Sequence, residues 1–131
     1  MASTSTPRTL SQSVASPGDL AVLAQLRASL DEEILSEVLR AHLSGVDELC
    51  EQLQAAGRRG DWREAAAVAR QIVAKTAVLG FRAVTNAAKS FAAAADEKLE
   101  AHMLRNGAQM VVFEHERLRL AIALQYPDLL V

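Results

Sequence analysis

The chain has 131 residues and a mass of 14.1 kDa, which is the size of one ordinary domain. Half of its residues are hydrophobic and only 4% are aromatic, and alanine, which favours helices over strands, dominates the hydrophobic half. The formal net charge of -2 argues against a dedicated nucleic-acid binder, and no apolar run suits a membrane span or a signal peptide. We therefore expect a helical cytoplasmic domain, and the lone cysteine, Cys50, is compatible with a reducing compartment.

The first part of the chain predicts a leader and a short helix. Residues 1–16 are rich in serine and threonine, which is typical of a disordered segment, so the helical domain is expected over residues 17–131. A transit peptide is the weaker alternative there, because arginine is sparse. Asp19 is expected to cap a short helix that presents Leu20, Leu23 and Leu26 on one face.

A long amphipathic helix is expected next. Asp31 is its expected N-cap, and Gly57-Arg58-Arg59-Gly60 is the turn that ends it. Between them, hydrophobic residues recur at helical spacing and predict one buried face. The residues expected on this face are Ile34, Leu35, Val38, Leu39, His42, Leu43, Val46, Leu49, Cys50 and Leu53.

Two further helices are expected on either side of Gly80. Asp61 is the expected cap of the first, and the second begins at about Arg82. The first is expected to bury Ala65, Val68, Ala69, Ile72, Thr76 and Leu79. The second is expected to bury Val84, Ala87, Ala88, Phe91 and Ala95.

The last helix is expected to be capped by Asp96 and to end at Tyr126-Pro127. Asn106-Gly107 leaves open whether this segment is one helix or two. Its expected inward positions are Leu99, Met103, Met110, Val111, Phe113, Leu118, Ile122 and Leu124. Four main helices with short connections predict an all-α fold, an antiparallel up-down four-helix bundle with a short extra N-terminal helix.

The stretch from Gly60 to Phe91 reads GDWREAAAVARQIVAKTAVLGFRAVTNAAKSF. It resembles the histidine-containing phosphotransfer (HPt) family. In that family a Gly-Asp-aromatic turn opens a helix with the motif His-x-aliphatic-Lys-Gly-small-small-x-x-aliphatic-Gly, and the next helix follows at once. Aligned without gaps on Leu79-Gly80, Ile72 takes the aliphatic position and Ala74 takes that of the first glycine. The resemblance covers most of residues 19–125.

The departures fall on the residues that carry the family's chemistry. Arg70 occupies the position of the phosphoacceptor histidine, Val73 that of the lysine, and Lys75 replaces a small residue. A neutral imidazole nitrogen can accept a phosphoryl group, but a guanidinium stays protonated and has no free lone pair. We therefore expect no enzyme activity, no catalytic residue and no cofactor at this site.

The resemblance implies a partner for the altered site. In the family, small residues beside the histidine let a receiver domain dock. Here Arg70, Val73, Ala74 and Ala77 share one side of the helix, at i, i+3, i+4 and i+7. We expect this surface to bind the receiver domain of a response regulator or hybrid histidine kinase, with Arg70 directed at the receiver's aspartates. The protein would then be a decoy or inhibitor in a two-component pathway.

Two other functions remain open. The first is a structural role as a homodimeric scaffold or helical adaptor, in which a partner helix covers Val73 and Ala74. The second is active phosphotransfer through a histidine outside the motif, which would be His42, His102 or His115. These three histidines are expected to be packed or surface residues, and no His or Cys spacing predicts a metal site.

Overall fold

The computed structural model describes residues 19–130, and this part of the chain is all-helical, without a strand. The expected leader over residues 1–16 lies outside the described residues. The helices are α2 (Ala21–Ser29), α3 (Glu32–Arg58), α4 (Trp62–Val78), α5 (Arg82–Asp96) and α6 (Ala101–Gln125), followed by a 3-10 turn, η1 (Pro127–Leu129). Tyr126 and Pro127 end the last α-helix, as the sequence predicts.

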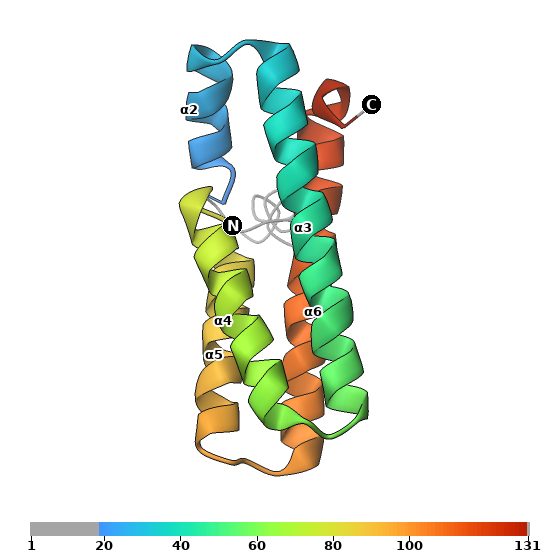
Figure 1. Ribbon diagram of the computed structural model, residues 1–131. Helices are drawn as coiled ribbons and strands as arrows, with labels where there is room; N and C mark the ends of the chain where they lie inside the picture. Colours follow the sequence, from blue (N-terminus) through green and yellow to red (C-terminus); the bar gives the residue numbers. More distant parts are fainter. Residues whose placement is uncertain (1–18, 131) are drawn as a thin grey trace, which may run out of the picture.

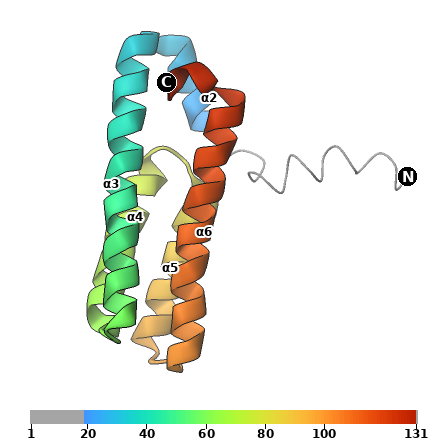
Figure 2. The same ribbon diagram turned by 90° about the vertical axis from the view of Figure 1, so that its right-hand side faces the viewer.

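The helices pack side by side along one axis (Figure 1). α3 contacts α4, α4 contacts α5, α5 contacts α6, and α6 returns to contact α3. The two long helices α3 and α6 extend beyond α4 and α5, and α2 lies in line with those shorter helices (Figures 1 and 2). η1 packs against both α3 and α6, where the hydroxyl of Ser36 donates to the carbonyl of Leu129 at 2.6 Å.

α3, α4 and α5 all end in the same hydrogen-bonded turn. In each, one amide bonds five residues back and the preceding amide bonds three residues back, which is the Schellman motif. The residue whose amide bonds three residues back must adopt a positive φ, and it is Gly60 (φ 70), Gly80 (φ 72) or Lys98 (φ 57). Glycine suits this conformation because it has no Cβ, so the sequence marks the first two turns and not the third.

Two predicted caps are wrong. Asp96 is the last residue of α5 and not the cap of α6, because the alanine run before it extends α5 until Lys98 turns the chain. Asp19 does not cap α2, whose N-cap is Leu20. Instead its buried carboxylate interacts with the first backbone amides of α5, at Arg82 and Ala83. Asp31 and Asp61 do cap their helices, accepting from the amides of Glu33 and Glu64.

α6 is continuous through Asn106-Gly107, which settles the question that the sequence left open. Gly107 faces Phe91 of α5, and a Cβ added there would lie 3.2 Å from the Cδ1 of that ring. The glycine therefore lets α5 and α6 approach closely and does not break the helix.

The buried face of α4 is predicted correctly, but those of α3 and α6 are predicted only in part. Ile34 and Val38 are exposed, since the short α2 covers less of the start of α3 than α4 covers further along. On α6 and the residues before it, the exposed side chains include Leu99, Met103, Met110, Phe113 and Leu124. The buried residues of α6 are Leu104, Ala108, Val111, His115, Leu118, Ala121 and Ile122.

Candidate functional site

The inner face of α4 is fixed by the core and by a buried pair of threonines. Ala65, Val68, Ala69 and Ile72 are fully buried. The Thr76 hydroxyl is 2.8 Å from the Ile72 carbonyl and 2.7 Å from the Thr85 hydroxyl, which in turn donates to the Phe81 carbonyl. These bonds link α4 to α5 on either side of Gly80, so the rotation of α4 about its axis is set.

The opposite side of α4 faces solvent and carries small and apolar residues. We call it the outer face of α4. It consists of Arg63, Ala67, Arg70, Ala74, Ala77 and Val78, all of which are exposed. Val78 has 75% of its surface exposed, the largest fraction among the exposed large hydrophobic side chains of the described residues. Three of the four residues predicted as a binding surface, Arg70, Ala74 and Ala77, therefore lie together in solvent.

Val73 is placed differently from the prediction. It is half-buried and packs against the hydrophobic core at the edge of the outer face. Ala67 and Val78 extend the outer face in both directions, and sequence reasoning did not single them out. The signal was present, because positions 67, 70, 74 and 78 continue the same helical spacing.

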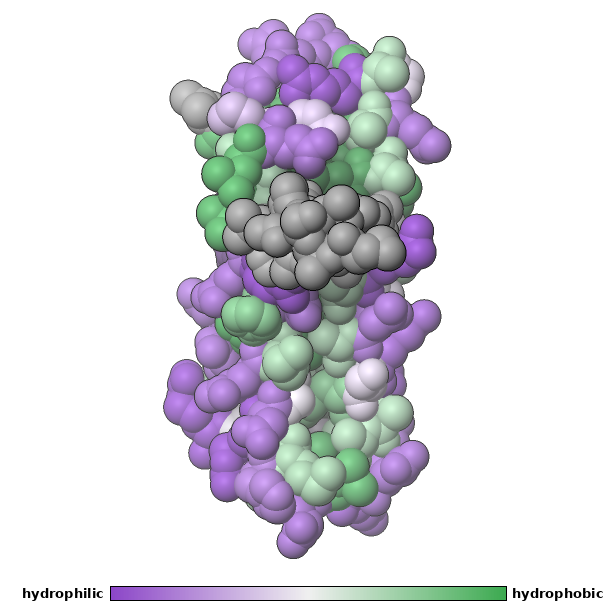
Figure 3. Space-filling view, turned by 180° about the vertical axis from the view of Figure 1, so that it is seen from behind, coloured by the Kyte–Doolittle hydropathy of each residue, from purple (hydrophilic) through white to green (hydrophobic). Residues whose placement is uncertain are grey.

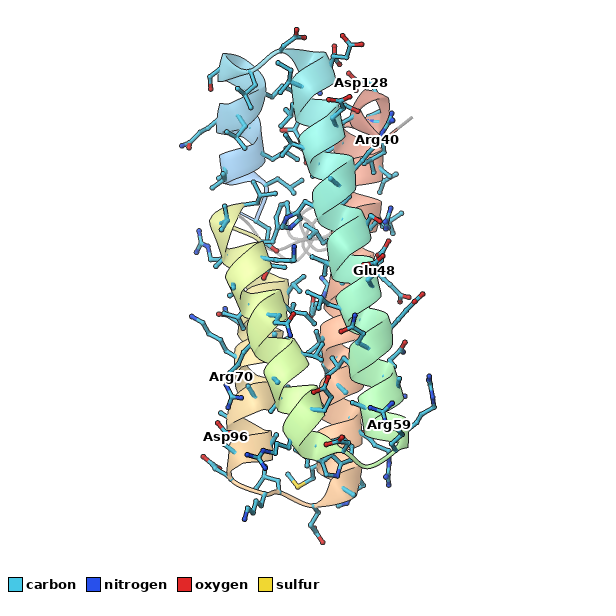
Figure 4. The ribbon with its side chains drawn as sticks, viewed as in Figure 1. Arg40, Glu48, Arg59, Arg70, Asp96 and Asp128 are labelled. Carbon is cyan, nitrogen blue, oxygen red and sulfur yellow. The ribbon has the colours of Figure 1, made fainter. Side chains whose placement is uncertain are left out.

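Arg70 is held by a carboxylate from the neighbouring helix. Its Nη2 donates to both oxygens of Asp96, at 2.5 and 2.7 Å (Figure 4). Both side chains remain more than half exposed. The pair joins α4 to the last residue of α5, and sequence reasoning, which gave Asp96 a capping role, did not foresee it. Water and salt screen such an exposed pair, so its net contribution is between zero and about 1 kcal/mol.

An open pocket of about 500 Å³ lies beside this pair. Its lining residues are Trp62, Arg63, Ala66, Arg70, Ala95, Asp96 and Lys98. Three of them are cationic and one is anionic, so the lining is net positive. This end of the outer face of α4 therefore favours an acidic partner.

A second polar cluster joins α3 to α6. The buried His115 donates from Nε2 to Asp47 Oδ1 at 2.6 Å, and Arg119 donates to the other oxygen of Asp47. Burial alone would raise the pKa of Asp47, but the hydrogen bonds from His115 and Arg119 bring it below its usual value. His115 thus connects two helices inside the protein, and it has no route to a large partner.

The other two histidines differ in exposure. His42 is half-buried on α3 with its ring edge against Phe81, and its Nε2 is buried. Burial, followed by the charges of Lys75 and His115, lowers the pKa of His42. Lys75 reaches α3, where a Cβ added to Gly45 would lie 3.5 Å from its Nζ. His102 is exposed on α6.

The cysteine and the carboxylates do not assemble a reactive centre in the described part of the chain. Cys50 is buried, and burial, with a smaller effect from the charges of Asp47 and Glu116, raises the pKa of its thiol to about 12. Within residues 19–130, no three His, Cys, Asp or Glu side chains gather in a way that could hold a metal ion.

No protein-family model matches this chain, and neither the curated proteins nor the solved structures contain a match. Among residues 19–130, none of the helices combines the length and the hydropathy that crossing a membrane requires.

Proposed function

We propose that the protein is an HPt-like module of a cytoplasmic phosphorelay that binds a receiver domain and does not accept phosphate. The receiver belongs to a response regulator or a hybrid histidine kinase, and it docks on the outer face of α4. In this proposal α3, α4, α5 and α6 are the antiparallel up-down four-helix bundle of that family, and α2 is the extra N-terminal helix. The observation that carries the proposal is the uncovered outer face of α4, with small residues around Arg70.

The shape of the outer face supports docking of another helix. Ala67, Ala74 and Ala77 leave the backbone of α4 accessible, so a partner helix can approach closely. Val78 adds an apolar contact at one end, and the positive pocket lies towards the other end. A receiver's acidic phosphorylation pocket, which the resemblance implies would cover this site, has the opposite charge to Arg63 and Arg70.

Arg70 can exchange one carboxylate partner for another. Its pair with Asp96 is exposed and uses only Nη2, so an incoming aspartate could form the fork-to-fork pair with two guanidinium nitrogens, in a site from which the partner excludes water. Because the existing pair contributes at most about 1 kcal/mol, this exchange has a small cost.

Burial argues against phosphotransfer through two of the alternative histidines. A phosphoryl donor must reach a ring nitrogen in line, but the Nε2 of His42 is buried and the Nε2 of His115 is bonded to Asp47. His102 is exposed on α6, with Arg105 three residues on, so burial does not argue against this histidine.

The test measures binding and label transfer together. The purified chain is titrated with receiver domains of the same cell by calorimetry, and separately incubated with the radiolabelled phosphorylated receivers. We expect a complex with at least one receiver, no acid-labile label on the chain, and at least tenfold weaker binding for Arg70→Glu. Arg40→Glu makes the same charge change on α3 and is the matched control (Figure 4).

Three outcomes would contradict the proposal. One is the absence of binding to every receiver, and another is equal weakening by Arg70→Glu and Arg40→Glu. The third is transfer of label to the chain, which would identify an active phosphotransfer protein with His102 as the first residue to replace. Circular dichroism of each variant checks that the helices are retained.

A further inference from the structure

α6 carries a second apolar surface that the core does not use. Five large hydrophobic side chains on α6 are about half exposed or more, and Leu124 reaches 66%. We call them the α6 stripe: Met103, Met110, Phe113, Leu120 and Leu124. Figure 3 shows hydrophobic surface between hydrophilic areas on the side of the molecule opposite to the view of Figure 1. An open groove of about 590 Å³ borders the stripe at Met110 and Phe113, with Gln54 of α3 on its other side.

The spacing of the α6 stripe is that of a coiled-coil seam. Its members fall on alternating steps of three and four residues once Asn106 and Arg117 are included as the two polar positions. This is the a and d pattern of three consecutive heptads, whereas the core residues Leu104, Val111 and Leu118 follow a separate line. A surface with this period fits another helix that has the same period, and a second copy of the chain supplies such a helix, its own α6.

We propose that two copies of this chain associate through their α6 stripes as an antiparallel pair. The two-fold axis passes between Val111 and Val112, near the middle of the helix. In this register every layer joins an a position to a d position, as antiparallel packing requires. The layers are Met110 with Phe113 of the second copy, Asn106 with Arg117, and Met103 with Leu120.

The polar positions select this direction and this register. Asn106 and Arg117 face each other across the pair, so the amide oxygen of one copy can accept from the guanidinium of the other. Arg117 lies at the edge of this surface with 24% of its side chain exposed, its guanidinium carbon 5.5 Å from the centre of the Phe113 ring and its Nη1 donating to Glu114. A parallel pair would instead set Arg117 against its own copy in the middle of the seam, where like charges repel.

The flanking positions are compatible with the antiparallel pair. Beside the seam, Gln109 lies opposite Glu116 of the second copy and Gly107 lies opposite Glu114. Neither juxtaposition brings like charges together, and the first allows an amide-to-carboxylate hydrogen bond.

The area available is sufficient for a dimer of moderate stability. The five side chains of the stripe, each about half exposed or more, contribute roughly 500 Å² per copy, because a large apolar side chain exposes on the order of 200 Å². Two copies therefore bury about 1,000 Å² from these residues alone, which is about the minimum for a specific interface. The dimer leaves the outer face of α4 uncovered, so it does not rest on the proposed receiver binding.

The first measurement is the mass of the full chain in solution across a range of concentrations. Sedimentation equilibrium should give twice the chain mass of 14.1 kDa at high concentration. Leu120→Glu should give a single chain at the same concentrations, because it places charges in the seam. Val78→Glu puts the same charge on the outer face of α4 and should remain dimeric. A wild-type monomer at all concentrations, or equal behaviour of the two variants, would overturn the proposal.

A disulfide test separates the antiparallel pair from other dimers, and it does not depend on the glutamate variants. A tagged chain with Met103→Cys is mixed with an untagged chain with Leu120→Cys and oxidised. The register predicts cross-links between the two chains, because these positions face each other. Each variant alone should not cross-link, since two copies of position 120 lie about 25 Å apart along the antiparallel pair. Self-linked Leu120→Cys chains would show a parallel pair and refute the register.

Asn106→Asp provides a gain-of-binding test. It places a carboxylate opposite Arg117 of the second copy, and we expect dimerisation to tighten by about two- to fivefold. Asn106→Lys should weaken it by a similar factor. The pairing of Asn106 with Arg117 would be contradicted if the dimer affinity did not fall from Asn106→Asp through the wild type to Asn106→Lys.

Discussion

The turn after α4 allows a steric contact to be separated from backbone strain. Gly60 and Gly80 end successive helices in the same motif with almost the same φ, 70 and 72 degrees. They differ in their surroundings. A Cβ at Gly60 would meet nothing within 4 Å, whereas a Cβ at Gly80 would lie 2.7 Å from Cγ2 of Val22 on α2. Alanine is therefore expected to cause the same conformational strain at both positions, and a clash with α2 only at position 80.

The expected losses in free energy of unfolding for the two alanine variants follow from these surroundings. Gly60→Ala should lower the free energy of unfolding by about 1 kcal/mol, the cost of holding an L-residue in the left-handed region. Gly80→Ala should lower it by that amount and by a further ~1–3 kcal/mol, because Val22 is β-branched and stiff and its helix must shift. Adding Val22→Ala to Gly80→Ala removes Cγ2 and should restore most of the difference.

Urea denaturation followed by circular dichroism measures the free energy of unfolding of the wild type and of each variant, including Val22→Ala alone. The wild type, Val22→Ala, Gly80→Ala and the double variant form a cycle that isolates the coupling between positions 22 and 80. Equal destabilisation by Gly80→Ala and Gly60→Ala, within about 0.5 kcal/mol, would contradict the clash with Val22. Additive effects of Val22→Ala and Gly80→Ala would contradict it too, since the clash requires both side chains.

Three further predictions concern single residues. Because the pKa of His42 is lowered in the folded protein, the unfolded chain binds the proton first as pH falls, and the free energy of unfolding should decline below about pH 6.5. Urea titrations at several pH values should show a smaller decline for His42→Leu. Lys98→Gly should raise the free energy of unfolding by about 0.5 kcal/mol and the melting temperature by about 2 °C, because glycine adopts positive φ without steric cost; an unchanged or lower melting temperature would contradict this. Cys50, buried and with its thiol pKa raised to about 12, should react with iodoacetamide at pH 8 only as fast as the protein opens, and mass spectrometry showing the rate of the denatured chain would refute its burial.

The local sequence predicts where a helix begins or ends when a residue type that favours caps or turns stands at that position. Asp31 and Asp61 are caps, and Gly60 and Gly80 are turns, as expected. The turn at Lys98 could not be predicted, because lysine rarely adopts positive φ, and the cap was therefore misplaced at Asp96. The role of Asp19 could not be predicted either, because its carboxylate interacts with amides of α5, more than sixty residues along the chain.

The candidate site divides in the same way. Helical spacing alone places Arg70, Ala74 and Ala77 on one side of a helix, since that geometry is local. The pairing of Arg70 with Asp96 is not local. It requires the end of α5 to lie beside α4, and neither residue type indicates its partner in advance.

The sequence by itself determined that the chain is helical, where most of its helices lie, and which face of α4 is buried. It did not determine the orientation of α6, because that helix has two apolar lines of nearly equal period. One runs through Leu104, Val111 and Leu118, and the other is the α6 stripe. Only the tertiary structure decided between them, since burial depends on which line meets α3 and α5, and those contacts arise between segments far apart in the chain.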